Sequence, residues 1–367
     1  MSLLDLQSQA RAKAGSVSRK RGLGLVLTLL AFALCSQVLR LSGNPSGPAW
    51  GGLRAIRQPL EIAIVGDSRA HVGLSPDKLG APWLFPENAG PKVYNFAVDG
   101  SDALQHASFM MHGLLKQETP PKLIVWAPNP LGFNRERTNN RVEQLLPADL
   151  PFLCKNGSPL EPLLDICTSA IFTPYRHRAN VAQRVNDFTD RLAWMAVHVQ
   201  TRILKLTHTP VPPPREYFPR EAGYVPFKIL NWPARFDRGV ADYAEKYASA
   251  RLSERHLLAA RDLLTAARRV GTHVVILEMP VAAWYVDNLT SKEFHAAWRR
   301  RMEKLANLEG ATFIQDAAAV GGNEGFGDPG HMSFETSQSY SAKLAWKLEG
   351  IPAVRAALGR VDAEEPL

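Results

Sequence analysis

Residues 61–67, EIAIVGD, run directly into Ser68 and Arg69, and they give the clearest indication of the fold class. Its apolar core is continuous rather than alternating with polar residues, which is typical of a strand buried on both faces of a parallel sheet. The Gly and Asp that end it are turn formers, so the strand is predicted to stop just before Ser68. Four more runs of this kind lie further along the chain, at residues 92–98, 122–127, 273–279 and 312–315.

Helical patterns separate these runs. They lie at residues 103–116, 254–270, 292–308 and 337–348. Helices that connect parallel strands cross over the sheet and cover both of its faces. The sequence therefore predicts an α/β fold, a doubly wound and mostly parallel five-stranded sheet.

The interval between the third and fourth strands is too long for an ordinary crossover. It holds about 140 residues, against a few dozen for a strand–helix–strand unit. Residues 130–251 are therefore predicted to contain a large, mainly helical insertion. Within it, residues 180–206 carry apolar side chains at every third or fourth position, which indicates an amphipathic helix. We expect its apolar stripe to pack on the insertion's own core; a helix on a membrane surface is the alternative, because Arg and Lys occupy the other faces.

The N-terminus combines a basic stretch with an apolar run. Residues 1–21 contain five Lys or Arg and one Asp, and residues 22–39, GLGLVLTLLAFALCSQVL, contain no charge. As a helix this run would be about 27 Å long, close to the roughly 30 Å of a bilayer's hydrocarbon core. We expect a cytoplasmic N-terminus at 1–21, a transmembrane signal anchor at 22–41, a linker at 42–57 and an extracytoplasmic domain at 58–367.

Two alternatives to the anchor stay open. Ala31 and Ala33 resemble the small residues of a signal-peptide cleavage site, so the run can instead be a cleaved signal peptide. The long basic stretch, and the extension of the apolar run beyond these residues, favour an uncleaved anchor. The other alternative is a cytosolic protein in which the same segment is a buried helix.

The net charge of +8 is concentrated at the N-terminus. Residues 1–41 contain six basic residues and one acidic residue, which leaves +3 for the remaining 326 residues. With the body so close to neutral, nucleic-acid binding loses its main support, so no nucleic acid is expected among the partners.

Two of the three cysteines, Cys154 and Cys167, flank a loop within the insertion. In an exported domain they can form a local disulfide; two free thiols are the alternative. Neither their spacing nor the positions of the ten histidines indicates a metal site. We therefore expect no metal and no cofactor.

Polar residues suited to catalysis follow the predicted strands. In open α/β sheets, ligands bind beyond the carboxyl ends of the strands. Ser68 follows the first strand, Gly100 the second and Asn129 the third, while Asp328 and His331 come after the fifth. An imidazole can take the proton of a serine hydroxyl, and a carboxylate can orient that imidazole. The amides of Ser68 and Gly100 and the side-chain amide of Asn129 can bind the oxyanion that forms.

Two other carboxylates near strand ends are assigned structural roles. Asp67 is expected to hold the turn before Ser68 through hydrogen bonds to the backbone. Glu278, near the end of the fourth strand, is expected to be capped or ion-paired.

These positions resemble the sequence blocks of the SGNH, or GDSL-like, hydrolase superfamily. Residues 66–69, Gly-Asp-Ser-Arg, are similar to its first block, Gly100 to its second, Asn129 to its third, and Asp328 with His331 to its fifth. The blocks occur in the family's order. The resemblance implies a flavodoxin-like sheet.

The resemblance also implies a role for each residue. Ser68 would be the nucleophile, His331 the base and Asp328 the group that orients the base. Ser68, Gly100 and Asn129 would form the oxyanion hole.

Two positions depart from the family's pattern. Residues 127–130 read Ala-Pro-Asn-Pro where the third block usually has Gly-x-Asn-Asp, which changes the turn that presents the Asn. Arg69 stands where hydrolases commonly have Leu. With the anchor, the chain resembles membrane-bound relatives that move acyl groups on extracellular polymers, such as alginate O-acetylation and D-alanine-transfer proteins.

The expected function is that of a membrane-anchored serine esterase or O-acyltransferase of the cell envelope. It would act through an acyl-serine on an acylated small molecule or, as we favour, an ester-modified envelope polysaccharide. A membrane-bound acyl-transfer protein is the expected partner. The alternative is a catalytically inactive SGNH-fold scaffold within an envelope polymer-modification complex.

Overall fold

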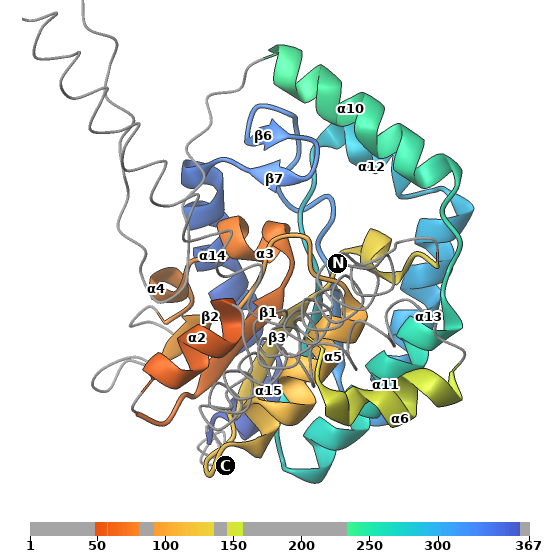
Figure 1. The fold of residues 1–367 in the computed structure, drawn as a ribbon. Helices are drawn as coiled ribbons and strands as arrows, with labels where there is room; N and C mark the ends of the chain where they lie inside the picture. Colours follow the sequence, from red (N-terminus) through yellow and green to blue (C-terminus); the bar gives the residue numbers. More distant parts are fainter. Residues whose placement is uncertain (1–47, 57, 81–91, 136–144, 157–232, 360–367) are drawn as a thin grey trace, which may run out of the picture.

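The computed structural model describes residues 48–56, 58–80, 92–135, 145–156 and 233–359 (Figure 1). Its centre is a five-stranded sheet in the order β2-β1-β3-β4-β5, and every neighbouring pair of strands is parallel. The strands are β1 (Ile62–Gly66), β2 (Val93–Asn95), β3 (Leu123–Ala127), β4 (His273–Glu278) and β5 (Thr312–Gln315). This order is that of flavodoxin-like sheets, so the expected fold class is confirmed.

Alternate residues of the strands enter two separate apolar cores. Ala63 and Val65 of β1 face one core, while Ile62 and Ile64 face the other. The first core is closed by α5 (Ala103–His112), α11 (Glu254–Arg269) and α13 (Glu293–Glu309), and the second by α14 (Phe334–Glu349) and α15 (Pro352–Ala357). Because both faces are covered, every residue of β1 and β3 is buried and apolar or glycine.

The remaining elements are short, apart from one helix. They are α2 (Pro48–Ala55), α3 (Ser68–Gly73), α4 (Pro76–Leu79), α6 (Leu150–Lys155), α10 (Pro233–Ala248) and α12 (Ala283–Leu289), with 3-10 turns at Leu114–Lys116, Pro130–Phe133 and Pro147–Asp149. A hairpin of β6 (Phe326–Asp328) and β7 (His331–Met332) was not expected. The last long helix, α14, begins three residues earlier than expected because the Ser333 side chain accepts a hydrogen bond from the Thr336 amide.

Only parts of the insertion belong to the described residues. Those parts that form regular structure are helical, and the longest is α10. The amphipathic pattern at 180–206, Cys167 and the apolar run at 22–41 all lie outside the described residues; Cys154 is exposed on α6. Within the described ranges, no helix has the length and apolar character needed to cross a bilayer.

The turn after β1 depends on the absence of a side chain at Gly66. A Cβ there would lie 2.5 Å from the Ala127 carbonyl oxygen and 2.6 Å from the Ala70 Cβ. Neither atom can move without shifting β3 or α3. Gly66 therefore lets α3 begin directly against the end of β3.

We expect Gly66→Ala to lower the free energy of unfolding by about 1–3 kcal/mol or more, because the added methyl group overpacks a backbone contact. Gly51→Ala is the matched control. Gly51 lies in α2 with no atom within 4 Å of an added Cβ, so this change should stabilise by up to about 1 kcal/mol through helix propensity. Urea unfolding of the two variants measures both effects, and equal stabilities would contradict the expectation.

Candidate active site

Ser68 is placed by the turn that ends β1. It is the first residue of α3, and Asp67 is the N-cap, its Oδ1 accepting a hydrogen bond from the Arg69 amide at 3.0 Å. The expected role of Asp67 in holding this turn is confirmed. A serine at a helix N-terminus right after a buried strand has its hydroxyl at the carboxyl edge of the sheet, where ligands bind in this class of fold.

His331 and Asp328 reach Ser68 from the β6–β7 hairpin. The Ser68 Oγ and His331 Nε2 atoms are 2.7 Å apart, although the residues are 263 positions apart in the chain. On the other side of the ring, His331 Nδ1 lies 2.8 Å from Oδ1 and 2.9 Å from Oδ2 of Asp328. The Asp328 Oδ1 atom also accepts a hydrogen bond from the Gly330 amide at 2.9 Å, which closes the turn.

This geometry selects one tautomer of His331. A carboxylate only accepts hydrogen bonds, so Nδ1 of His331 carries the proton that points to Asp328. In the neutral ring, Nε2 is then unprotonated and accepts the hydrogen bond of the Ser68 hydroxyl. The three side chains have the order and polarity of a nucleophile, base and orienting carboxylate.

Gly100 follows β2, and its turn is tied to the end of β1. Gly100 has φ of +71°, a conformation that favours glycine. The Val98 amide and the Ser101 hydroxyl both donate to the Gly66 carbonyl, at 2.9 and 3.0 Å. The His71 ring, one turn of α3 after Ser68, contacts Asp99 through Nδ1 at 2.8 Å. The turn therefore lies beside the nucleophile, on the β2 side.

Asn129 follows β3, on the other side of β1. Its Nδ2 donates to Asp67 Oδ2 at 2.9 Å, and its Oδ1 accepts from the Leu131 amide at 3.0 Å. Residues Pro130–Phe133 form a 3-10 turn that the Asn129 side chain caps. The strand order β2-β1-β3 puts Ser68 between Gly100 and Asn129, so the structure gathers all five predicted site residues at one edge of the sheet.

A second serine–histidine pair near the site has the opposite polarity. Ser101 Oγ lies 2.7 Å from His106 Nε2, and Trp126 Nε1 donates to His106 Nδ1 at 3.1 Å. Because Nδ1 accepts this bond, the proton of the neutral ring is on Nε2 and is donated to Ser101. Ser101 therefore has no base. It holds the turn that carries Gly100.

A third group, Ser108, His112 and Asp149, is not a triad either. Ser108 Oγ donates to Asp149 Oδ2 at 2.6 Å, and His112 Nε2 contacts Asp149 Oδ1 at 3.0 Å. Both side chains bind the same carboxylate, and the Ser108 hydroxyl donates its proton to that carboxylate rather than to the imidazole. This group fastens α5 to the segment that precedes α6.

Arg69, the departure from the family's first block, is buried with 4% of its surface exposed. Its Nη2 donates to the Tyr285 hydroxyl at 2.9 Å. The guanidinium carbon lies 4.8 Å from the centre of the Tyr285 ring and 5.6 Å from that of Tyr243. Two aromatic faces and a hydroxyl thus surround this cation, which is an arrangement that stabilises a buried guanidinium.

Helix α10, at the end of the insertion, packs against the Asp328–His331 turn (Figure 1). A Cβ at Gly239 of α10 would lie 2.7 Å from the Pro329 side chain. A Cβ at Gly330 would lie 2.2 Å from the Tyr243 hydroxyl and 3.3 Å from Arg69 Nε. The turn therefore rests directly on Tyr243 and Arg69, with glycines at both points of closest approach.

Glu278 is ion-paired, as expected. Its carboxylate accepts hydrogen bonds from Arg299 Nε at 2.8 and 2.9 Å, and Oε1 lies 2.6 Å from His295 Nε2. Burial alone would raise the pKa of Glu278, but these two partners outweigh it and lower the pKa. Burial lowers the pKa of His295, although its contact with Glu278 acts in the opposite direction.

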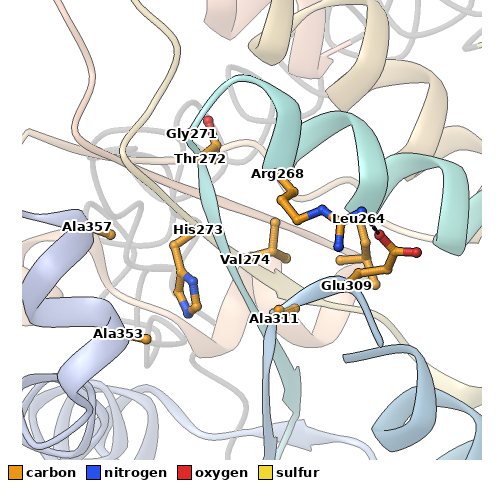
Figure 2. A pocket seen from close by; sticks show the side chains of 11 residues that line it. Leu264, Arg268, Gly271, Thr272, His273, Val274, Glu309, Ala311, Ala353 and Ala357 are labelled. Atoms are coloured by element: carbon orange, nitrogen blue, oxygen red, sulfur yellow. Dashed lines mark ion pairs between the residues drawn. The ribbon is translucent and has the colours of Figure 1, made fainter. Parts of the chain in front are cut away.

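Within the described ranges, neither a metal cluster nor the hollow beside α11 and α15 offers a second site of chemistry. No group of three or more His, Cys, Asp or Glu residues there could hold a metal ion. A hollow of about 260 Å³ lies at the opposite, amino edge of the sheet, between the end of α11, the start of β4 and α15 (Figure 2). Arg268 and Glu309 on its wall are ion-paired at 3.2 Å. It is far from the catalytic edge and offers no candidate chemistry.

The residues that support the site from other elements were not predicted from the sequence. Tyr243, Tyr285 and His106 are not adjacent to any of the predicted blocks, and Ser101, although it follows Gly100, has no sequence signal for its structural role. The one available signal was the departure at Arg69, because a buried cation requires partners somewhere in the fold.

Comparisons with known proteins add little beyond the fold. No protein-family model and no curated protein matches the chain. Among solved structures it is similar to TesA, with 12% identity, a TM-score of 0.37, and coverage of 81% of this chain and 99% of that one. It is also similar to an acylhydrolase candidate from Bacteroides fragilis NCTC 9343, with 10% identity, a TM-score of 0.36, and coverage of 84% and 94%. Likeness this weak carries no information about function, which therefore rests on the site itself.

The lowered pKa values of His295 and Glu278 predict acid sensitivity. Both groups bind protons more weakly in the folded than in the unfolded protein, so their contribution to stability is present at neutral pH. This contribution is lost as the pH falls, first below 6.5, the ordinary pKa of a histidine such as His295, and then below 4.5, the ordinary pKa of a glutamate such as Glu278. Urea unfolding as a function of pH should show this loss, and His295→Gln should remove the part near 6.5. An unchanged pH slope in His295→Gln would contradict the assignment.

Proposed function

We propose that this chain is a serine-dependent enzyme of acyl esters in which Ser68 forms an acyl-enzyme. One observation carries the proposal: the Ser68 hydroxyl is hydrogen-bonded to His331 Nε2 at 2.7 Å while Asp328 holds Nδ1. The family resemblance of the sequence agrees with this chemistry. The structural likeness to hydrolases is too weak to support it.

The reaction proceeds in two steps. Ser68 Oγ attacks the ester carbonyl as its proton passes to His331 Nε2, and the imidazolium then donates that proton to the leaving alcohol. The acyl group is now on Ser68. An acceptor O–H, from water or a sugar, gives its proton to His331 Nε2 and attacks the acyl carbonyl; when the tetrahedral intermediate collapses, the proton returns to Ser68 Oγ. The products are a carboxylic acid or a new ester.

The oxyanion of each tetrahedral intermediate requires donors that are already in place. The amides of Ser68 and Gly100 and the Nδ2 group of Asn129 are the proposed donors. Asn129 Nδ2 has two hydrogens, of which one points to Asp67 Oδ2. Each donor of this kind typically contributes a factor of about 10² to 10³ in rate.

We further propose that the acceptor and the substrate belong to the cell envelope. The apolar N-terminal run would keep the enzyme beside an acylated envelope polysaccharide, and a membrane-bound acyl-transfer protein would supply the acyl group. Hydrolysis and transfer share the acyl-Ser68 intermediate. The partition of the acyl group between water and an added acceptor glycan distinguishes an esterase from an O-acyltransferase.

A fluorophosphonate probe tests the nucleophile. We expect it to label Ser68 of the full chain, and we expect Ser68→Ala and His331→Ala each to lower hydrolysis of an activated short-chain ester by about 10⁴-fold or more. Ser108→Ala is the matched control, because Ser108 is a buried serine near a histidine and a carboxylate but lacks a base. It should keep wild-type labelling. A folded wild-type chain that is not labelled would instead support the inactive scaffold.

The proposed location has its own test. The full chain should remain in the membrane pellet after an alkaline wash, with protease added from outside able to digest residues 58–367. Val26→Arg with Leu29→Arg should release the chain from membranes, because each charge at a helix centre opposes insertion by about 2.5–3.5 kcal/mol. A mature chain that begins near Leu34 would show that the run is a cleaved signal peptide, and wild-type protein in the cytosol would exclude both.

A further inference from the structure

A continuous chain of buried side chains leads from Arg69 to Glu278. Arg69 Nη2 donates to the Tyr285 hydroxyl, which is hydrogen-bonded to the Tyr247 hydroxyl. Tyr247 is 3.1 Å from His295 Nδ1, and His295 Nε2 is 2.6 Å from Glu278 Oε1. Beside the Tyr247–Tyr285 contact, the two rings meet edge to face, and the Tyr247 ring stacks on that of His295.

All hydrogen bonds in this series of side chains point in the same direction, from Arg69 towards Glu278. The Glu278 carboxylate accepts from His295 Nε2–H, so Nδ1 of the neutral ring accepts from the Tyr247 hydroxyl. Tyr247 has then used its proton and accepts from Tyr285, which in turn accepts from Arg69. Burial raises the pKa of Tyr247, so its hydroxyl stays protonated.

The direction of the bonds joins opposite charges at the two ends. Arg69 carries the positive charge and Glu278 the negative charge, and the two tyrosines and the histidine between them are neutral. Among the described residues, Arg69 has no carboxylate within ion-pair distance. Glu278 is itself ion-paired with Arg299, and Asp67 is the carboxylate that acts on the Arg69 charge from nearby. The chain therefore ties Arg69 to β4 through oriented hydrogen bonds, which polarise one another in a low-dielectric interior.

The Arg69 end lies against the turn that carries the base. Arg69 follows the nucleophile in sequence, and its Nε faces Gly330, which precedes His331. Tyr243, whose ring is beside the guanidinium, faces the same glycine from α10. Arg69 therefore contacts both halves of the Ser68–His331 pair, one through the main chain and the other through the loop.

We propose that Arg69 is a positioning residue that fixes the distance between Ser68 and His331, and that the chain through Tyr285, Tyr247 and His295 to Glu278 holds Arg69 in place. This inference rests on the proposed function, since it assigns a role within the same acyl-transfer site. The buried end of β4, some distance from the reacting atoms, thereby contributes to the rate.

A fixed guanidinium matters because the Ser68–His331 contact crosses two independent segments. The α3 turn and the β6–β7 hairpin meet through the packing of α3 on β7 and through their common contact with Arg69. A rigid side chain packed between them sets their spacing. Loss of the hydrogen bonds from Arg69 to Glu278 would leave the guanidinium free to change rotamer. The β6–β7 hairpin would then be less well placed.

The test is the second-order rate constant for fluorophosphonate labelling of Ser68 in the full chain. This constant reports on each folded molecule and is unaffected by the fraction that folds. The variants are Arg69→Lys, Tyr285→Phe and Tyr247→Phe; the last keeps its ring and touches neither Ser68 nor His331. Tyr340→Phe is the matched control, because Tyr340 is an equally buried tyrosine whose hydroxyl bonds to Asp316, outside the chain.

We expect Arg69→Lys and Tyr285→Phe to label at least about tenfold more slowly and Tyr247→Phe about three- to tenfold more slowly, since misplacement by about 1 Å can cost about 10²-fold in rate. Tyr340→Phe should stay within about twofold of the wild type. In ester hydrolysis the loss should appear in kcat, with KM little changed. The double variant Arg69→Lys with Tyr247→Phe should be hardly slower than Arg69→Lys alone, because both changes act through Arg69.

The outcomes separate this inference from the proposed function. If the wild type is labelled at Ser68 while Tyr285→Phe and Tyr247→Phe react at the wild-type rate, the positioning role is wrong and the nucleophile assignment stands. Multiplicative effects in the double variant would also overturn the inference, because they would mean that Tyr247 acts independently of Arg69. If the folded wild type is not labelled, the proposed function fails and the inference falls with it.

Discussion

The hydrogen bond between Ser68 Oγ and His331 Nε2 can form only when the whole described fold is in place. Ser68 is set by the end of β1, which is buried between β2 and β3 and turns sharply at Gly66. His331 comes from a hairpin beyond β5 that is supported by α10 and α12. An error of even 1 Å in either position would separate Ser68 from His331, so the packing of both cores is also a condition for the proposed catalysis.

Much of this arrangement could be predicted from the sequence because strands buried on both faces appear in it as continuous apolar runs. Continuous apolar runs located β1, β3 and β4 to within a residue or two, and the rule that ligands gather at the carboxyl ends of strands then selected Ser68, Gly100, Asn129, Asp328 and His331. The boundaries of β2 and α14 were less well predicted. In both cases a side chain, that of Asn95 or Ser333, bonds to a nearby backbone amide and changes where the regular structure begins or ends.

The support of the site could not be predicted in this way. The contacts of Arg69 with Tyr243 and Tyr285 join residues that are more than 170 positions apart, and no periodic pattern encodes such a contact. The same holds for Trp126, whose indole donor decides the tautomer of His106 and so excludes Ser101 as a nucleophile. Sequence blocks identify groups that can react; the direction of hydrogen bonds, which needs coordinates, decides which of them do.

The contact of α10 with the Asp328–His331 turn bears on how this fold can be shortened or recombined. A compact version that joins the turn after Asn129 directly to α11 would keep all five strands, the crossover helix and every predicted site residue. It would nevertheless lose Gly239 and Tyr243, which form one wall behind the turn. The long segment between the two strands is therefore not a detachable module. Helix α10 packs against the β6–β7 hairpin, so a chimera that exchanges this segment has to retain the residues from Pro233 onward.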